Sequence, residues 1–279
     1  MNSIKEKPFA YVMIIVYFLF HILIWFSHGR FTICKDHESY AFIFTICWLF
    51  FTFYTIIAYF SAAFSDPGYL VEDWNHNNPN TKVDANSEDD KLYCDKCKIT
   101  RPLRAHHCKE CNKCVLMMDH HCIFTSNCVG FRTLRPYFVF LISFPLDGLF
   151  SILMIMCNLE KKEKNAFKAL VFAFSFLYFA IFLLVDFIQL YTILSNLIRN
   201  SSEVENERDQ SQKSEYDLYG VDQVSEFDTG SIFRNFQQKL GNNPFAWFIP
   251  LPRNGQFIMA SKNPKYVPFS EIKSCKKID

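Results

Sequence analysis

Cysteine and histidine gather in one short stretch of this 279-residue chain. Two pairs, Cys94 with Cys97 and Cys108 with Cys111, have the spacing with which one tight turn presents two ligands to zinc. Each pair can be completed by a later histidine and cysteine. The candidate ligands are Cys94, Cys97, His106, His107, Cys108, Cys111, Cys114, His120, His121, Cys122 and Cys128. Two tetrahedral sites need eight ligands, so this stretch predicts two structural zinc ions and leaves groups to spare.

The run Asp119-His120-His121-Cys122 indicates a second kind of chemistry. A thiolate is a far better nucleophile than a thiol, and an imidazole that accepts the thiol proton raises its reactivity near neutral pH. A carboxylate on the other ring nitrogen fixes the tautomer. Asp119, His120 and Cys122 can fill these three roles if Cys128 completes a zinc site. The residue types alone leave Cys122 open as a further zinc ligand.

Basic residues accompany the cysteines, namely Lys96, Lys98, Arg101, Arg104, Lys109 and Lys113. Three thiolates and one histidine around a divalent cation carry a net negative charge, which these residues offset. They could also hold an anionic ligand such as a nucleotide phosphate, and a solvated basic face is the alternative.

Four apolar blocks must position this segment, and half of all residues are hydrophobic. The blocks run from Phe9 to Phe26, Tyr40 to Phe64, Tyr137 to Cys157 and Ala169 to Ile198. A hydrocarbon core of about 30 Å needs roughly 20 helical residues, so we predict four transmembrane helices. The first block could be a signal peptide, but its apolar run is longer than a signal core and no small-residue cleavage site closes it.

An even number of spans places both termini and the cysteine-rich segment on one side of the membrane. Basic residues beside the spans favour the cytoplasm for that side, namely Lys5, Lys7, Arg132, Arg135 and Arg199. Lys161, Lys162 and Lys164, which lie between the last two spans, favour the opposite orientation. The cytoplasm is reducing, so the cysteines there indicate metal binding or catalysis rather than disulfides. The net charge of +1 does not indicate nucleic acid as a partner.

The connecting segments divide the chain into five predicted parts. Residues 1–68 hold the first two spans and the turn Asp66-Pro67-Gly68, which ends the second helix. Residues 69–92 form a polar connector and residues 93–136 the zinc-binding catalytic module. Residues 137–199 hold the third and fourth spans, and residues 200–279 form a cytoplasmic C-terminal segment that is partly disordered.

The C-terminal segment contains two contrasting stretches. Residues 200–226 are polar and poor in apolar side chains, which predicts a mobile stretch. Ile232, Phe233, Phe236 and Leu240 then line one face of a short helix that Gly241 ends. This helix either lies at the membrane interface or packs against the catalytic module.

The cysteine-rich segment resembles the DHHC family of protein S-acyltransferases, the palmitoyltransferases. The resemblance rests on Cys94-Asp-Lys-Cys97, Arg101-Pro102, His106-His107-Cys108, Cys111, Cys114, Met118-Asp119-His120-His121-Cys122 and Asn127-Cys128-Val129-Gly130. It also covers the four spans, the turn at Asp66 and, more weakly, the C-terminal segment. The implied fold is an all-α integral membrane protein of four transmembrane helices, with a cytoplasmic zinc module between the second and third.

The resemblance also implies roles for individual residues. One zinc is held by Cys94, Cys97, His107 and Cys114, and the other by Cys108, Cys111, His121 and Cys128. Both zinc ions are structural, because neither keeps an open position. Cys122 is then the nucleophile, His120 its general base and Asp119 the group that orients His120. Arg101, Arg104 and His106 are expected to contact the phosphates of coenzyme A.

The implied reaction is a two-step acyl transfer. Cys122 attacks a long-chain acyl-coenzyme A, with palmitoyl as the expected group, and a cysteine of a membrane-associated protein then attacks the acyl-enzyme. The acyl chain is expected to lie among the spans, where each buried methylene contributes about 0.8 kcal/mol. The expected location is the endoplasmic reticulum, the Golgi or the plasma membrane, and the need for an accessory subunit stays open.

Several positions depart from the family pattern. Ile123-Phe124 stand where the family usually has Pro-Trp, and Thr133 replaces a usual asparagine. Ser201-Ser202-Glu203 matches the Thr-Thr-x-Glu element only loosely, and Asn235 with Leu240-Gly241 matches a C-terminal asparagine element imperfectly. Because some departures touch the catalytic surroundings, a catalytically silent zinc-containing membrane adaptor is the alternative.

The apolar blocks contain two acidic residues, Asp147 and Asp186. An ionisable group within a span is costly and usually faces protein or water. Asp147, in the middle of the third block, is a candidate for the residue that limits an acyl cavity. A position nearer a polar interface is the alternative.

Overall fold

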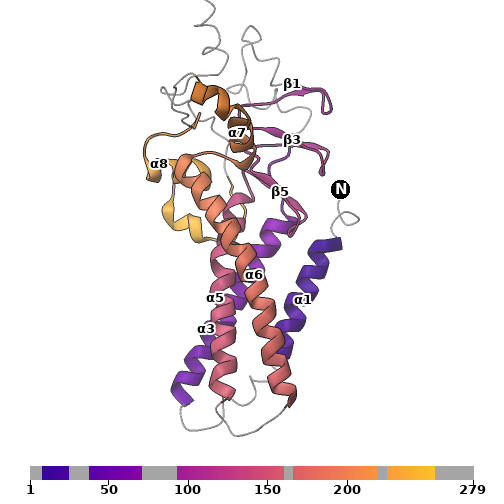
Figure 1. Cartoon of the computed structure of the whole chain (residues 1–279), viewed down its shortest axis with the longest axis vertical. Coiled ribbons are helices and arrows are strands. Elements are labelled where there is room, and N and C mark those ends of the chain that lie inside the picture. Colours follow the sequence, from indigo (N-terminus) through magenta and orange to yellow (C-terminus); the bar gives the residue numbers. More distant parts are fainter. Residues whose placement is uncertain (1–7, 25–37, 71–92, 160–165, 219–224, 255–279) are drawn as a thin grey trace, which may run out of the picture.

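The computed structural model describes residues 8–24, 38–70, 93–159, 166–218 and 225–254. Four helices run along the long axis and carry short strands at one end (Figure 1). The helices are α1 (Pro8–Ile24), α3 (Glu38–Phe64), α5 (Leu134–Leu159) and α6 (Ala166–Arg199). The end of α3, the start of α5 and the end of α6 all lie at the end of the molecule that holds the strands, called the strand end below. The helix bundle therefore supports the strands and their side chains.

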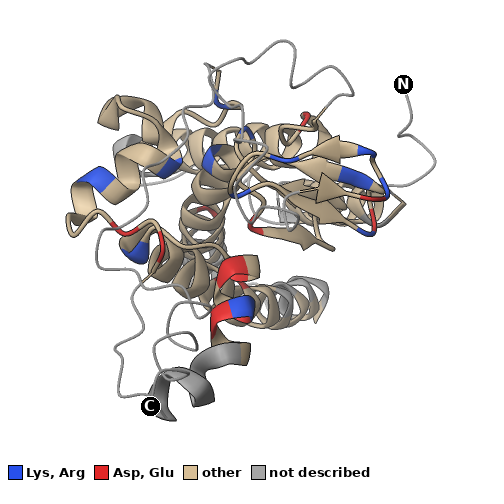
Figure 2. Ribbon diagram, turned by 90° about the horizontal axis from the view of Figure 1, so that it is seen from above, with Lys and Arg blue, Asp and Glu red and all other residues tan. Residues whose placement is uncertain are grey.

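Three antiparallel hairpins make up the strand end. They pair β1 (Tyr93–Cys94) with β2 (Ile99–Thr100), β3 (His106–Cys108) with β4 (Lys113–Val115), and β5 (His120–Cys122) with β6 (Asn127–Val129). The C-terminal part adds α7 (Glu203–Leu218), which contacts the hairpin segment, and α8 (Ile232–Leu240) and the short 3-10 helix η5 (Pro244–Phe248), which pack against α6 and α5. Seen from above, most charged residues lie on the hairpins and the C-terminal helices (Figure 2).

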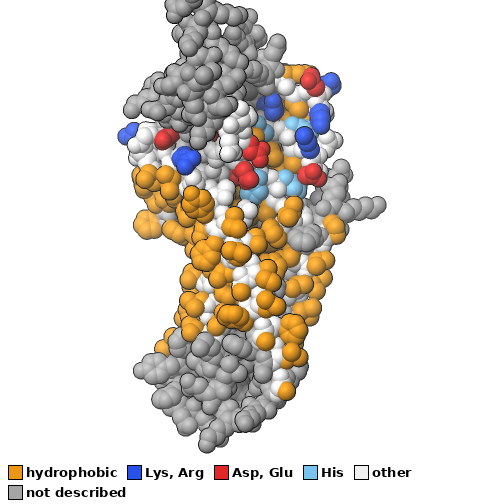
Figure 3. Space-filling model, in the orientation of Figure 1, with side chains coloured by type: hydrophobic (Ala, Val, Ile, Leu, Met, Phe, Trp, Pro, Cys, Tyr) orange, Lys and Arg blue, Asp and Glu red, His pale blue; other side chains and the backbone are white. Residues whose placement is uncertain are grey.

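The long helices identify a membrane protein. Within the described residues, three segments are long and apolar enough to cross a membrane, namely Thr45–Phe64, Leu134–Leu153 and Phe179–Arg199. The apolar part of α1, Ala10–Leu23, is shorter. Apolar side chains cover the visible face of the bundle, whereas the charged side chains lie at the strand end (Figure 3). The prediction of spans is therefore confirmed for three blocks, and the first block stays a prediction.

A buried polar cluster joins three of the long helices. The carboxylate of Asp147 on α5 is 2% exposed. It accepts hydrogen bonds from the hydroxyls of Tyr17 on α1 and Thr52 on α3, at 2.6 and 2.7 Å. The Nε2 atom of His21 on α1 lies 2.9 Å from the same carboxylate. Because a carboxylate in an apolar bundle is costly unless it has partners, this cluster fixes α1 against α3 and α5.

The predicted turn after the second span is confirmed. The Asp66 carboxylate accepts from the backbone N–H groups of Gly68 and Tyr69, both at 2.8 Å. Gly68 has a φ of 108°, which favours glycine. The carbonyl of Gly68 then accepts from the N–H of Leu116 at 2.9 Å. The turn therefore both ends α3 and attaches it to the strand end.

We expected residues 200–226 to be mobile, but most of the described part of this stretch is helical, and residues 219–224 lie outside the described residues. Residues 203–218 form helix α7. The hydroxyl of Ser202 accepts from the N–H of Glu205 at 3.2 Å, which caps the first turn. Acidic residues in that turn also interact favourably with the helix dipole. The sequence did not predict this helix because many of its contacts, such as that of Glu205 with Arg104, are polar and leave no apolar pattern.

The predicted helix before Gly241 is confirmed as α8. It packs against the end of α6, where the amide of Asn235 donates to the carbonyl of Ile198 at 2.7 Å. Its residues Lys239 and Leu240 are buried, while Ile232 and Phe233 are 59% and 53% exposed. The ammonium of Lys239 also lies 3.6 Å from the Asp119 carboxylate, so α8 contacts the catalytic module as well as α6, and part of its apolar face stays exposed.

Candidate zinc centres and active site

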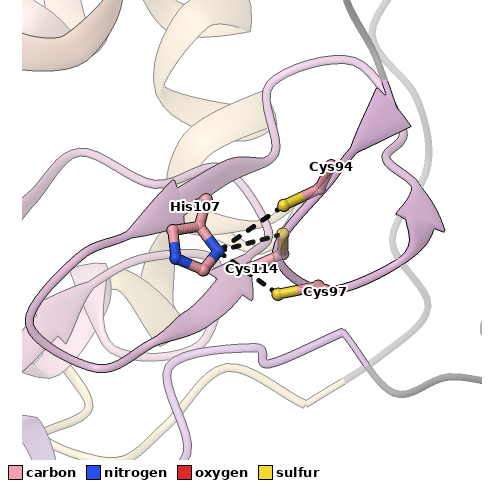
Figure 4. Close-up of side chains that lie close together, drawn as sticks. All are labelled: Cys94, Cys97, His107 and Cys114. Atoms are coloured by element: carbon pink, nitrogen blue, oxygen red, sulfur yellow. Dashed lines mark hydrogen bonds between the residues drawn. The ribbon is translucent and has the colours of Figure 1, made fainter.

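The first ligand set combines two neighbouring hairpins. Cys94 and Cys97 come from the β1–β2 hairpin, while His107 and Cys114 are opposite each other in the β3–β4 pair. The Nδ1 atom of His107 lies 3.6, 3.2 and 3.9 Å from the sulfurs of Cys94, Cys97 and Cys114. Figure 4 shows the three sulfurs gathered around this nitrogen.

The second set repeats this arrangement one hairpin further along the chain. Cys108 and Cys111 come from the β3–β4 hairpin, while His121 and Cys128 are opposite each other in the β5–β6 pair. The Nδ1 atom of His121 lies 3.5, 3.4 and 3.6 Å from the sulfurs of Cys108, Cys111 and Cys128. Each set thus joins one hairpin to the next.

Both sets fit zinc. Zinc–sulfur bonds of about 2.3 Å and zinc–nitrogen bonds of about 2.0–2.1 Å in a tetrahedron place sulfur and nitrogen about 3.5 Å apart, close to the separations found here. Within each set, all ligand atoms lie within 4.8 Å of one another. The six cysteines concerned are free of disulfides. Four protein ligands leave no open position, so zinc here would be structural.

The carboxylate of Asp119 lies against the imidazole of His120. Asp119 is 1% exposed, and its Oδ2 atom lies 3.2 Å from Nδ1 of His120. The amide of Asn196 on α6 donates to both carboxylate oxygens, at 3.2 and 3.3 Å. The ammonium of Lys239 on α8 lies 3.6 Å from Oδ1. Burial alone would raise the pKa of Asp119, but His120 and Lys239 outweigh burial and lower it.

Cys122 lies in neither zinc set. Its thiol, at the end of β5, is 3.7 Å from the hydroxyl of Tyr137. Burial opposes ionisation of the thiol, but the imidazole of His120 outweighs it and lowers the pKa of Cys122 to about 7. Burial also opposes a charged imidazole, but Asp119 and Cys122 outweigh it and raise the pKa of His120 to about 10. The site therefore favours a thiolate beside an imidazolium.

The His120 ring has one nitrogen available for proton transfer. Its Nδ1 atom faces Asp119, and Glu203 of α7 lies 3.4 Å from the same nitrogen. Its buried Nε2 atom has no hydrogen-bond partner among the described residues. Nε2 can therefore take the thiol proton when Cys122 reacts.

Arg104 has partners that the sequence did not indicate. It is 6% exposed, and its guanidinium donates to both carboxylate oxygens of Glu205, at 2.8 and 3.0 Å. It also donates to the side chain and the carbonyl of Asn200, both at 2.9 Å. Arg104 thereby fastens the hairpins to the end of α6 and to α7. Its contact with coenzyme A stays a prediction.

Arg101 and His106, the other two residues expected to bind coenzyme A, lie closer to the surface. Arg101 is half-buried and donates to the carbonyl of Ala105 at 3.3 Å. Burial lowers the pKa of His106 to about 4, and the neighbouring arginines act in the same direction against Glu205. His106 is therefore neutral near pH 7, and only Arg101 of these two would offer a positive charge to a phosphate.

Three residues of the site had no sequence signal. Asn196, Glu205 and Lys239 are common residue types that lie far from the cysteines in the chain, and only the packing of α6, α7 and α8 brings them to Asp119 and Arg104.

The departure from the family pattern at Thr133 is accommodated by two hydrogen bonds. The hydroxyl of Thr133 accepts from the N–H of Gly130 at 3.0 Å and donates to the carbonyl of Cys128 at 2.8 Å.

Replacing Glu205 by alanine is expected to destabilise the protein by about 3–5 kcal/mol, because it leaves a buried guanidinium without its carboxylate. The measurement is the free energy of unfolding, followed by zinc release in denaturant. Glu207→Ala is the matched control, since Glu207 lies on the same helix and is exposed. Equal stabilities of the two variants would contradict this role of Glu205.

An apolar cavity borders Tyr137, whose hydroxyl lies 3.7 Å from the sulfur of Cys122. About 460 Å³ of empty space is lined by Met13, Tyr59, Phe124, Tyr137, Phe140, Leu141, Phe144, Phe182, Val185, Asp186 and Gln189. A second hollow of about 400 Å³ is lined by Met13, Ile14, Tyr17, Phe18, Thr55, Ile56, Tyr59, Phe60, Phe140 and Phe144. Because the two share four lining residues, they adjoin, and together they lead from the Cys122 end of the bundle toward Tyr17.

The geometry defines an integral membrane protein with two zinc-type ligand sets and a Cys-His-Asp arrangement at the end of its helices. A family model described as DHHC palmitoyltransferase matches residues 87–210. The chain is 27% identical over 259 residues to "Probable protein S-acyltransferase 12" of Arabidopsis thaliana, covering 87% of this chain and 82% of that protein. It is 51% identical over 49 residues to "Palmitoyltransferase ZDHHC2" of Rattus norvegicus, covering 18% and 13%. The match over residues 87–210 and these relatives confirm the resemblance of the chain to the DHHC family.

Proposed function

We propose that this protein is a protein S-acyltransferase that moves a long fatty acyl group, with palmitoyl as the expected one, from acyl-coenzyme A to protein cysteines. The observation that carries the proposal is the buried thiol of Cys122, which has a lowered pKa and lies between His120 and an apolar cavity. The names of the relatives support acyl transfer to proteins.

In the first step, His120 takes the proton of Cys122 and the thiolate attacks the carbonyl carbon of the acyl-coenzyme A thioester. The bond to coenzyme A sulfur breaks, and the coenzyme leaves as a thiol with that proton. In the second step, a target cysteine attacks the acyl-enzyme in the same way. Both steps exchange one thioester for another, so the protein contributes nucleophilicity and position rather than driving force.

The zinc ions have a supporting role in this proposal. They would join the three hairpins, and the β5–β6 hairpin carries Cys122. The adjoining ligand His121 would hold one side of Cys122 in place, while Asn127, directly opposite Cys122 in the β5–β6 pair, anchors this end of the hairpin. The amide of Asn127 donates to the carbonyls of Ala62 and Ser65 at the end of α3, at 2.9 and 2.8 Å. The thiol is thereby fixed above the cavity.

We place α1 in the membrane as a fourth span. Its 17 residues measure about 25 Å, slightly less than the hydrocarbon core. The buried contacts of Tyr17 and His21 with Asp147 hold it against the spans on α3 and α5. With four spans, both termini and the catalytic module lie on one side, and the basic residues Arg132, Arg135 and Arg199 favour the cytoplasm for it.

The adjoining hollows provide the acyl site, and the cluster of Tyr17 and Asp147 forms its far end. Tyr17→Ala is expected to shift the acyl preference toward longer chains, because each additional buried methylene is worth about 0.8 kcal/mol, a factor of about four. The measurement is the profile of acylation rate against chain length. Tyr191→Ala, at a site 75% exposed, is the control. An unchanged profile in Tyr17→Ala would exclude this end of the cavity.

Resemblance to the family supports our proposals for the coenzyme, the acceptor and the location. Arg101, Arg104 and His106 remain the proposed contacts of the coenzyme A phosphates, with Arg101 the best placed. The proposed acceptors are cysteines of membrane-associated proteins at an endomembrane or the plasma membrane, and an accessory subunit would act at the same cytoplasmic face.

The proposal is tested by separating the two steps. The purified protein in vesicles is incubated with tagged palmitoyl-coenzyme A, freed of donor, and given a lipid-anchored peptide with one cysteine or the same peptide with serine. We expect transfer to the cysteine peptide alone, released by hydroxylamine. Protein that binds zinc fully but takes no acyl group would contradict the proposal and favour the silent membrane adaptor.

A further inference from the structure

The hydroxyl of Tyr137 lies against the proposed nucleophile. Tyr137 is near the start of α5 and is 2% exposed. Its oxygen is 3.7 Å from the sulfur of Cys122 and 3.4 Å from Oε1 of Gln189 on α6. Its ring packs edge-on against the imidazole of His120, with centroids 5.5 Å apart. The hydroxyl therefore lies beside the thiol, and the ring that carries it packs against the imidazole of His120.

The polar side chains of the neighbouring cavity are few. Apart from Tyr59, whose hydroxyl donates to the carbonyl of Phe124 at 2.7 Å, they are Tyr137, Gln189 and Asp186. Gln189 and Asp186 lie one turn apart on α6, and Gln189 contacts Tyr137. A saturated acyl chain has one polar group, the carbonyl at its thioester end. Polar groups beside the thiol therefore suit that carbonyl and not the rest of the chain.

Phe124, two residues after Cys122, cannot donate a hydrogen bond to the thioester carbonyl. Phe124 lines the same cavity but has no hydrogen-bond donor on its side chain. It stands where the family usually has tryptophan, whose indole N–H is a donor. In this chain a side-chain donor at the thiol end of the cavity must come from another position.

We propose that the Tyr137 hydroxyl donates a hydrogen bond to the thioester oxygen during both acyl transfers, with Gln189 as its positioning residue. This inference rests on the proposed function. When the Cys122 thiolate bonds to the carbonyl carbon, an electron pair of the double bond moves to the oxygen, and Tyr137 stabilises that charge. The pair then returns, the bond from carbon to the leaving sulfur breaks, and that sulfur takes the proton held by His120.

Distances agree with this role. A donor stabilises an oxyanion best when it lies about 2.7–3.1 Å from the oxygen. In the acyl-enzyme this oxygen is bonded to the carbon that is attached to the sulfur of Cys122. A donor 3.7 Å from the sulfur itself is within reach of such an oxygen after a small rotation of the hydroxyl. Without substrate, the hydroxyl donates to Oε1 of Gln189 at 3.4 Å, which is long for such a bond. Rotation of the hydroxyl toward the substrate would exchange this weak bond for one to the thioester oxygen.

Tyr137→Phe tests the proposal because it removes the hydroxyl and keeps the ring. The rate constant of Cys122 acylation at saturating palmitoyl-coenzyme A is measured in wild type and in zinc-replete Tyr137→Phe. In the variant it is expected to fall about 10²-fold, with little change in KM. Gln189→Met is expected to give a smaller loss of the same kind. Tyr191→Phe, an exposed tyrosine on the same helix as Gln189, is the matched control.

A spectroscopic readout separates this role from a structural one. The infrared band of a ¹³C-labelled acyl-enzyme carbonyl is expected at a higher frequency in Tyr137→Phe than in wild type, because a hydrogen bond weakens the carbonyl bond. An unchanged rate and an unchanged band in Tyr137→Phe would overturn the role of Tyr137 and leave the acyltransferase intact. Absence of acylation in wild type would overturn the proposed function and this inference with it.

Discussion

Removing one zinc ligand is expected to abolish acyl transfer altogether. Zinc binding contributes about 10–16 kcal/mol to the folding of small zinc modules, which equals or exceeds the total stability of most domains. The hairpins here have two or three residues per strand, so they have little other means of holding their shape. Cys108→Ala should lose zinc, and because Cys108 and Cys111 join the second hairpin to the third, the β5–β6 hairpin with Cys122 should lose its position.

Zinc content and acylation rate are the two quantities to measure for this variant. Cys47→Ala is the matched control, because Cys47 is also a free cysteine but lies on α3, away from both sets. The control should keep its zinc and its rate. A Cys108→Ala protein that retains both would show that the four-residue sets do not hold metal in the way proposed.

Replacing His120 by alanine is expected to slow the acylation of Cys122 by about 10²–10⁴-fold, the usual contribution of a general base. The imidazole is what lowers the pKa of the thiol against the effect of burial. Without it, the buried thiol should stay protonated near neutral pH. Because His120 belongs to neither set of four cysteine and histidine ligands, zinc content should not change.

Single-turnover labelling with tagged palmitoyl-coenzyme A measures this effect. Asp119→Asn should give a smaller loss, since the imidazole remains but its orientation and charge are less well supported. Asn196→Ala should be milder still, because Lys239 continues to contact Asp119. A His120→Ala protein that acylates at the rate of wild type would remove His120 from the mechanism.

The sequence predicted well those parts of the molecule that depend on rare residue types close together in the chain. Cysteine and histidine at zinc-ligand spacing, together with the family resemblance, indicated the two sets that the hairpins bring together. The long apolar blocks predicted four spans, and the structure has three helices that meet the length and composition of a span among its described residues. The turn at Asp66 was predictable because aspartate, proline and glycine each have a local conformational reason to be there.

Contacts between distant, common polar residues were not predictable. Lys239 and Asn196 reach Asp119 only because α8 and α6 pack at the strand end, and neither residue has a distinctive spacing. Residues 200–226 read as mobile because their polar side chains resemble those of a solvated segment. In the structure, the amide of Asn206 donates to Asn196 at 2.7 Å, and Glu205 pairs with Arg104. Polar packing of this kind leaves no hydrophobic period in the sequence.

The most direct test of the account is the position of the acyl group on the protein. Purified protein is treated with tagged palmitoyl-coenzyme A, and the modified residue is identified by mass spectrometry of its peptides, with zinc content measured in parallel. We predict a hydroxylamine-labile acyl group on Cys122, absent from a Cys122→Ala variant that still binds zinc. An acyl group on another cysteine, with the same labelling in Cys122→Ala, would contradict the role assigned to Cys122.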